Sequence, residues 1–190
     1  MRKIALVGDI GSGKTFYSRL FGYPVFNADL VVSNLYQKDK FLFGKIKKKF
    51  PNKMRNFPLK KEELLKIIFQ KQKNLNILGK IIHPIVRKKM KSFFKKNKNK
   101  KFVILDIPLF LENRLNTKED IIICVEADKK KIKQKLNKRK HINPRLINIL
   151  RKNQLPLRFK KKKSTYVIKN NFVRNTAKKN VKLIMKEISK

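Results

Sequence analysis

The fold of this chain is decided by the segment Gly8-Asp9-Ile10-Gly11-Ser12-Gly13-Lys14-Thr15. It fits the pattern G-x-x-x-x-G-K-[ST], follows an apolar run at residues 4–7 and precedes a stretch at 16–21 that can form a helix. A strand, a glycine-rich turn and a helix in this order place backbone amides and the positive end of a helix around a phosphate group. We therefore predict that all eight residues form a site for ATP or GTP.

Three side chains in this segment bear on its chemistry. Lys14 can reach the β- and γ-phosphates, and the hydroxyl of Thr15 can bind Mg²⁺. The carboxylate of Asp9 would repel the phosphates if it pointed toward them, so we expect it to face away. The expected ligands of the segment are thus a nucleoside triphosphate and Mg²⁺.

Four further apolar runs resemble the one before the loop. They occur at residues 25–26, 102–105, 121–125 and 166–168, and helical patterns separate them, including a final one that runs from Ala177 to Ile188. Short continuous apolar runs are typical of strands buried on both faces of a parallel sheet. Because strands alternate with helices, we predict an α/β fold with a five-stranded parallel sheet flanked by helices.

A length of 190 residues suits a single domain, 1–190. Residues 30–100 contain helical patterns and no convincing strand, so we expect a helical insertion there that handles the second substrate. His83-Pro84 interrupts a long helical pattern in this insertion, and a proline disfavours helical geometry in the residue before it. We expect a kink or a helix junction at that point.

The composition is unusually basic. Lys and Arg number 52 against 12 Asp and Glu, a net charge of +40, with lysines in every part of the sequence. A biased amino-acid usage explains this even spread better than a nucleic-acid site does, although an anionic partner suits both interpretations. Cys124, in the fourth apolar run, is expected to be a buried structural thiol. Without a leader or a long apolar segment, we expect a soluble cytoplasmic protein.

The remaining motifs separate the classes of nucleotide-binding protein. An Asn-Lys-x-Asp segment for guanine recognition does not occur, which disfavours a GTPase and leaves a small-molecule kinase as the leading class. The chain resembles the dephospho-CoA kinase family in an ordered series of motifs that covers nearly all of it. After the phosphate loop these are Val25-Phe26-Asn27-Ala28-Asp29, Ile82-His83-Pro84-Ile85-Val86-Arg87, Asp106-Ile107-Pro108-Leu109-Phe110-Leu111-Glu112, Leu136-Asn137-Lys138-Arg139, Gln154-Leu155-Pro156 and Tyr166-Val167-Ile168-Lys169-Asn170-Asn171.

The resemblance implies transfer of the γ-phosphate of ATP to the 3′-hydroxyl of 3′-dephospho-CoA. It also implies that Asp29 is the general base, a role suited to a carboxylate just after the second strand. The alternative is that Asp29 caps a helix beginning at Leu30. The family usually has aspartate where this chain has Asn27, and a second glycine where it has Asp9.

On the acceptor side, the resemblance assigns substrate binding to Lys61, His83 and Arg87 as well as to Asp29. Residues 139–163 correspond to a lid, in which Arg139 would stabilise charge in the transition state. For the other cations of that segment, including the lysines at 160–163, a solvated surface is the default expectation.

Two positions keep more than one interpretation. Asp106 either holds Mg²⁺ through water or caps the turn at Pro108. Asn170 would lie near the adenine by resemblance, but Phe172 stands where the family usually has glycine. Because of the net charge of +40, an RNA-associated P-loop NTPase remains the alternative function. The sequence does not indicate an oligomeric state.

Overall fold

The computed structural model describes residues 1–54, 56–71, 73–138 and 143–190. It divides into two compact units. One consists of Met1–Asn27 together with Asn97–Lys190, and the other consists of Ala28–Lys96.

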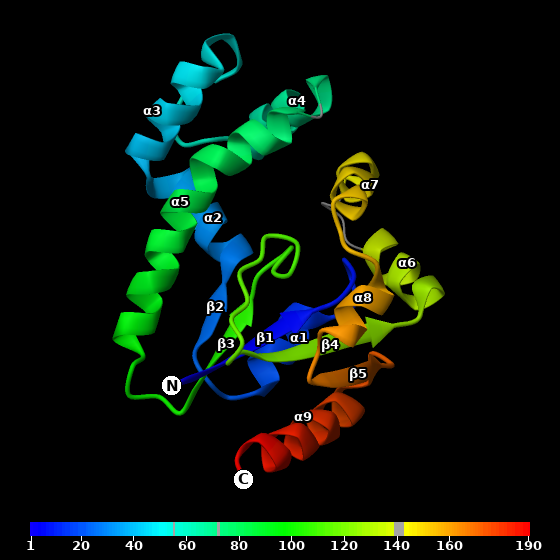
Figure 1. The fold of residues 1–190 in the computed structure, drawn as a ribbon. Coiled ribbons are helices and arrows are strands. Elements are labelled where there is room, and N and C mark those ends of the chain that lie inside the picture. Colours follow the sequence, from blue (N-terminus) through cyan, green and yellow to red (C-terminus); the bar gives the residue numbers. More distant parts are fainter. Residues whose placement is uncertain (55, 72, 139–142) are drawn as a thin grey trace. The chain divides into compact units, whose positions relative to one another are not determined.

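The first unit is built on a parallel sheet, as the sequence predicts (Figure 1). Its strands lie in the order β2-β3-β1-β4-β5, and every neighbouring pair is parallel. Their bounds are β1 Arg2–Val7, β2 Val25–Asn27, β3 Phe102–Asp106, β4 Ile121–Ala127 and β5 Tyr166–Asn170. Each of the five predicted apolar runs therefore forms a strand.

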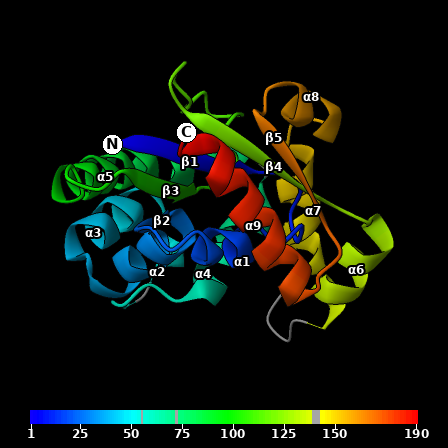
Figure 2. The same cartoon turned by 90° about the horizontal axis from the view of Figure 1, so that it is seen from below.

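The central strands have apolar side chains on both faces because helices or loops cover both sides of the sheet. All five residues of β3 are buried, and Ile4, Leu6 and Ile123 are fully inaccessible to solvent. Helices α1 (Lys14–Leu20) and α9 (Arg174–Ile188) pack against each other and share the core of one face (Figure 2). The same unit contains α6 (Lys129–Asn137), α7 (Pro144–Lys152) and α8 (Leu157–Lys162).

The second unit is helical and has its own core. It consists of α2 (Ala28–Lys38), α3 (Lys40–Lys49), the short 3₁₀ helix η1 (Pro51–Lys53), α4 (Lys61–Gln70) and α5 (Lys73–Lys96). Leu42, Ile46 and Ile67 are completely buried between these helices. The unit therefore has an apolar centre of its own.

Of the two alternatives expected at His83-Pro84, the helix junction is wrong, because α5 continues through Pro84, and a kink within the helix stays a prediction. A proline removes one amide donor from a helix and leaves the carbonyl four residues earlier without its partner. Pro84 lies on the exposed side of α5, where water can bind that carbonyl, while Leu78 and Ile82 stay buried in the core. Packing of the buried side keeps the helix intact.

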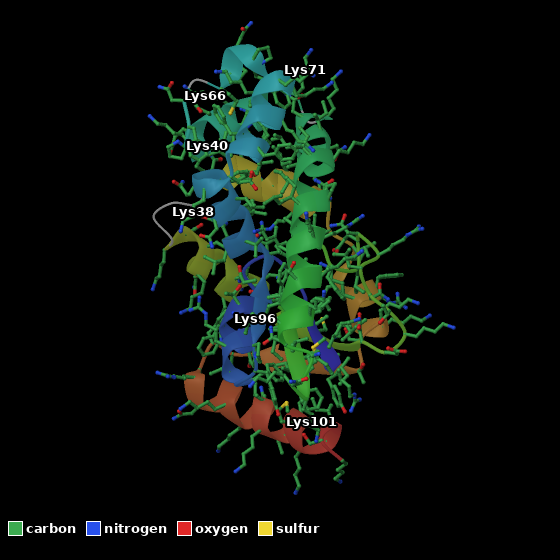
Figure 3. The ribbon with its side chains drawn as sticks, turned by 90° about the vertical axis from the view of Figure 1, so that its left-hand side faces the viewer. Lys38, Lys40, Lys66, Lys71, Lys96 and Lys101 are labelled. Atoms are coloured by element: carbon green, nitrogen blue, oxygen red, sulfur yellow. The ribbon has the colours of Figure 1, made fainter. Side chains whose placement is uncertain are left out.

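Exposed basic side chains come from many elements of the chain. The lysines labelled in Figure 3 are exposed and come from α2, α3, α4, α5 and two flanking positions: Lys38, Lys40, Lys66, Lys71, Lys96 and Lys101. This spread favours a bias in composition over one basic binding segment. Among the described residues, none of the helices combines the length and apolar character that a membrane crossing requires.

Cys124 lies in β4 and is completely buried, as predicted. Burial raises the pKa of its thiol to about 11, with a smaller contribution from the negative charge of Glu126. Because the thiolate is the reactive form, we expect a chromogenic disulfide reagent at about pH 8 to label the guanidinium-denatured chain completely and the native chain hardly at all. Equally fast labelling of both states would contradict this prediction.

Candidate functional site

The phosphate loop connects β1 to α1 and therefore follows the carboxyl end of the central strand. The chain crosses from β3, on one side of β1, to β4 on the other. A position of this kind is where open α/β sheets bind their ligands. The topology thus places the loop at the expected edge of the sheet.

The ammonium group of Lys14 is bound within the loop itself. Its Nζ donates to the carbonyl oxygens of Gly8 at 3.0 Å and Asp9 at 2.8 Å. These are neutral acceptors, and a triphosphate would offer charged ones, which form stronger hydrogen bonds with an ammonium group. Lys14 is therefore close enough to the loop to serve a phosphate held there, as its predicted role requires.

The C-terminal strand supports the loop through Asn170. This side chain is 4% exposed; its Nδ2 donates to the Ser12 carbonyl at 2.8 Å and its Oδ1 accepts from the Phe172 amide at 2.9 Å. A Cβ at Gly13 would lie 2.4 Å from Asn170 Nδ2, so only glycine permits this contact. The predicted contact of Asn170 with ATP stays a prediction, and the observed contacts hold the loop in place.

Phe172 adopts a backbone conformation that is rare for its residue type. Its φ is +65°, in the left-handed region where the family resemblance implied glycine. The ring lies 5.6 Å from Lys135 Nζ, a cation–π contact. This departure from the family pattern therefore keeps the glycine-like backbone and adds an aromatic side chain.

Asp106 forms a pair with Asn27 at the ends of two neighbouring strands. The two residues are in register on β2 and β3, and Asn27 Nδ2 donates to Asp106 Oδ2 at 2.6 Å. Asp106 is 4% exposed. A second carboxylate at position 27 would repel Asp106 at such a distance, whereas the amide of Asn27 donates a hydrogen bond. This contact explains how the chain tolerates asparagine at this position.

The oxygen atoms near the loop suit a magnesium ion. Thr15 is exposed in the first turn of α1, and Asp106 ends β3, so a hydroxyl and a carboxylate are available as the hard ligands that Mg²⁺ prefers. In the part of the chain that the structure describes, no group of three or more His, Cys, Asp or Glu side chains could hold a metal. These residues fit a metal bound chiefly to water and phosphate oxygens.

A cavity of about 810 Å³ opens beside the loop, within the first unit. Asp9 and Ile10 line it together with residues of α6 and α7, including apolar Ile132 and Ile147 and the cation Arg151. Arg139, to which the family resemblance assigns a role in the transition state, lies outside the described residues. The lid at 139–163 stays a prediction.

Asp29 lies in the second unit, in the first turn of α2. The helix begins at Ala28 and not at Leu30, so the alternative role of Asp29 as its N-cap is wrong. The chain reaches α2 directly from β2, which puts Asp29 two residues beyond Asn27. Its predicted role as general base remains open to experiment.

The remaining acceptor-side residues are also in the second unit. Lys61 begins α4, and His83 and Arg87 lie one turn apart on α5. Partial burial, and then the positive charge of Arg87, lower the pKa of His83 below its usual 6.5. The ring is therefore neutral at physiological pH, with one nitrogen that donates and one that accepts a hydrogen bond. It lies against Gly79, where a Cβ would approach within 3.3 Å of His83 Cε1.

The structure also reveals a buried ion pair that the sequence interpretation missed. Lys160 was expected on a solvated surface, but it is 2% exposed and its Nζ lies 3.1 Å from Glu112 Oε1. The expectation was wrong because Lys160, alone among the four lysines at 160–163, is buried, and its Nζ reaches the phosphate loop. Nothing in the local sequence separates it from its neighbours.

Comparison with known proteins identifies the family. The dephospho-CoA kinase family, CoaE, matches residues 2–175. The chain belongs to the dephospho-CoA kinase family. A dephospho-CoA kinase from Wolbachia sp. subsp. Brugia malayi is 32% identical over 190 residues, covering 97% of this chain and 95% of that one. The resemblance predicted from the ordered motifs is confirmed.

Solved structures agree on the fold of this dephospho-CoA kinase family member. A protein from Thermus thermophilus has a TM-score of 0.80 and 23% identity, covering 98% of this chain and 97% of its own. The dephospho-CoA kinase from Campylobacter jejuni has a TM-score of 0.66 and 19% identity over the same shares of the two chains. The predicted P-loop kinase fold is therefore confirmed.

Proposed function

We propose that this chain transfers the γ-phosphate of ATP to the ribose 3′-hydroxyl of 3′-dephospho-CoA, forming coenzyme A and ADP. The observation that carries the proposal is the family match over residues 2–175, which includes a complete phosphate loop with Lys14 bound inside it. The 3′-hydroxyl oxygen attacks the γ-phosphorus, the bond to the β–γ bridging oxygen breaks, and ADP leaves.

Positioning and electrostatics supply most of the catalysis in such a transfer. Lys14 binds the β- and γ-phosphates and gives up at least one of the carbonyls of Gly8 and Asp9. The loop amides hold the remaining phosphate oxygens.

On the acceptor side, Asp29 accepts the proton of the attacking hydroxyl. Lys61, His83 and Arg87 bind the acceptor, and the neutral ring of His83 serves as a hydrogen-bonding group. By the family resemblance, Arg139 stabilises the charge that develops on the transferred phosphate.

Thr15 and Asp106 are the residues that would hold Mg²⁺, the first directly and the second through water. When bound, the ion neutralises phosphate charge and orients the γ-phosphate. The pairing of Asp106 with the amide of Asn27 supports this assignment, because it leaves one carboxylate oxygen for water while fixing the other.

An assay of ADP release tests the proposal. With ATP and Mg²⁺ present, we expect turnover that requires 3′-dephospho-CoA and does not respond to added RNA. Coenzyme A is the matched control acceptor, because its 3′-position already carries a phosphate, and it should support no turnover. RNA-stimulated ADP release without dephospho-CoA would instead establish the alternative, an RNA-associated NTPase.

A further inference from the structure

Three side-chain donors converge on one backbone carbonyl of the phosphate loop, among the residues that the structure describes. The Gly8 oxygen lies 3.0 Å from Lys14 Nζ, 3.4 Å from Gln154 Nε2 and 3.5 Å from Lys160 Nζ. A carbonyl oxygen has two lone pairs, so the three donors compete for it. Gln154 also accepts from the Ile10 amide through Oε1 at 3.3 Å.

Lys160 is buried at a position where stability alone does not require a cation. Its partner Glu112 lies 3.1 Å away and also accepts from the Leu155 amide at 3.0 Å. Burying an ammonium group costs free energy, and a buried ion pair is often no more stabilising than apolar side chains of the same volume. What an apolar side chain could not do here is donate a hydrogen bond to Gly8.

ATP binding changes which donors are left for the Gly8 carbonyl oxygen. To bind both the β- and the γ-phosphate, Lys14 must give up at least one of the Gly8 and Asp9 oxygens, because its ammonium group has three donors. Lys160 is 2% exposed and Gln154 is held by the Ile10 amide at 3.3 Å, so both can remain at the Gly8 carbonyl. Without them the Gly8 oxygen would lose its side-chain donors when Lys14 leaves, and that loss would oppose ATP binding.

We propose that Lys160, together with Gln154, is a positioning residue that holds the Gly8 carbonyl while Lys14 moves to the phosphates. It acts through the loop and lowers the free energy needed to release Lys14. Its effect therefore falls on nucleotide binding and not on the chemical step. The proposal rests on the proposed function only in taking ATP as the nucleotide.

Lys160→Met tests this, because methionine has a similar volume and no donor. We expect the dissociation constant of ATP, measured by calorimetry, and the KM for ATP to rise about 10-fold with kcat unchanged, the size expected for one charge-assisted hydrogen bond. Lys161→Met is the matched control. It removes the same charge from the next residue, whose Nζ pairs with Glu126 at 3.0 Å and whose side chain is 40% exposed, and it should leave both constants unchanged.

The double variant Glu112→Gln/Lys160→Met separates positioning from a merely structural role. It leaves no lone buried charge, and Gln still offers an oxygen to the Leu155 amide, so folding stability should recover. ATP binding should remain about 10-fold weaker than in the wild type, because the donor to Gly8 is still missing. ATP affinity that returns to the wild-type value, or a Lys160→Met variant that matches Lys161→Met, would overturn the proposal. Calorimetry with ATP alone needs no acceptor, so a negative result with dephospho-CoA leaves this test intact.

Discussion

Asp29→Asn is expected to lower kcat about 10³-fold while leaving the dissociation constant of ATP unchanged. Removing a general base typically costs 10²- to 10⁴-fold in rate, and asparagine has the same shape without the ability to take the proton. Asp29 lies in the first turn of α2, so asparagine there causes little change in helix stability. The measurements are initial rates of ADP release and calorimetry with ATP.

Asp39→Asn provides the matched control for this variant. Asp39 also lies at the start of a helix of the second unit, where its carboxylate accepts from the Leu42 amide at 2.8 Å and caps α3. Asparagine caps a helix about as well as aspartate does, so activity should not change. A kcat for Asp29→Asn within about 3-fold of the wild type would refute the assignment of the base, since the smallest effect expected is far larger.

The sheet could be predicted from the sequence because each strand is buried on both faces. Continuous apolar runs such as residues 102–105 have no polar alternation that would allow another interpretation, and all five residues of β3 are indeed buried. The phosphate loop was equally clear, because its residue types follow from the chemistry of phosphate binding and it adjoins a strand.

Long-range contacts of single side chains could not be predicted. The bond from Asn170 to the Ser12 carbonyl joins residues far apart in the sequence, and so does that from Lys160 to Gly8. Pattern arguments use neighbours along the chain, and a lysine in a run of lysines gives no sign that it is buried. The same limitation affected Pro84, where core packing of α5 outweighs a local preference for a break.

Phosphate binding explains only part of the need for glycine at position 8. The motif accounts for Gly8 by the approach of the backbone to phosphate. In the structure, Gly8 also lies against β4: a Cβ there would be 2.3 Å from the carbonyl oxygen of Val125, and its φ is +139°. A strand carbonyl in the middle of the sheet cannot move away as a flexible side chain could. Gly8 is therefore required by the packing of the sheet itself, whether or not a nucleotide is bound.

Gly8→Ala should thus destabilise the nucleotide-free protein by about 4 kcal/mol, since it combines a strained backbone with an overlap against a fixed strand. This is a large share of the roughly 5–15 kcal/mol that stabilises a typical domain. The midpoint of urea unfolding, measured without ATP, reports the change.

Gly22→Ala is the control, because its φ is also positive, +71°, but a new Cβ would meet no atom within 4 Å. It should cost only about 1 kcal/mol. If β4 requires glycine at position 8, Gly8→Ala unfolds at a much lower urea concentration than Gly22→Ala before any nucleotide is added. If glycine there served phosphate binding alone, Gly8→Ala would weaken ATP binding but unfold at the same urea concentration as Gly22→Ala.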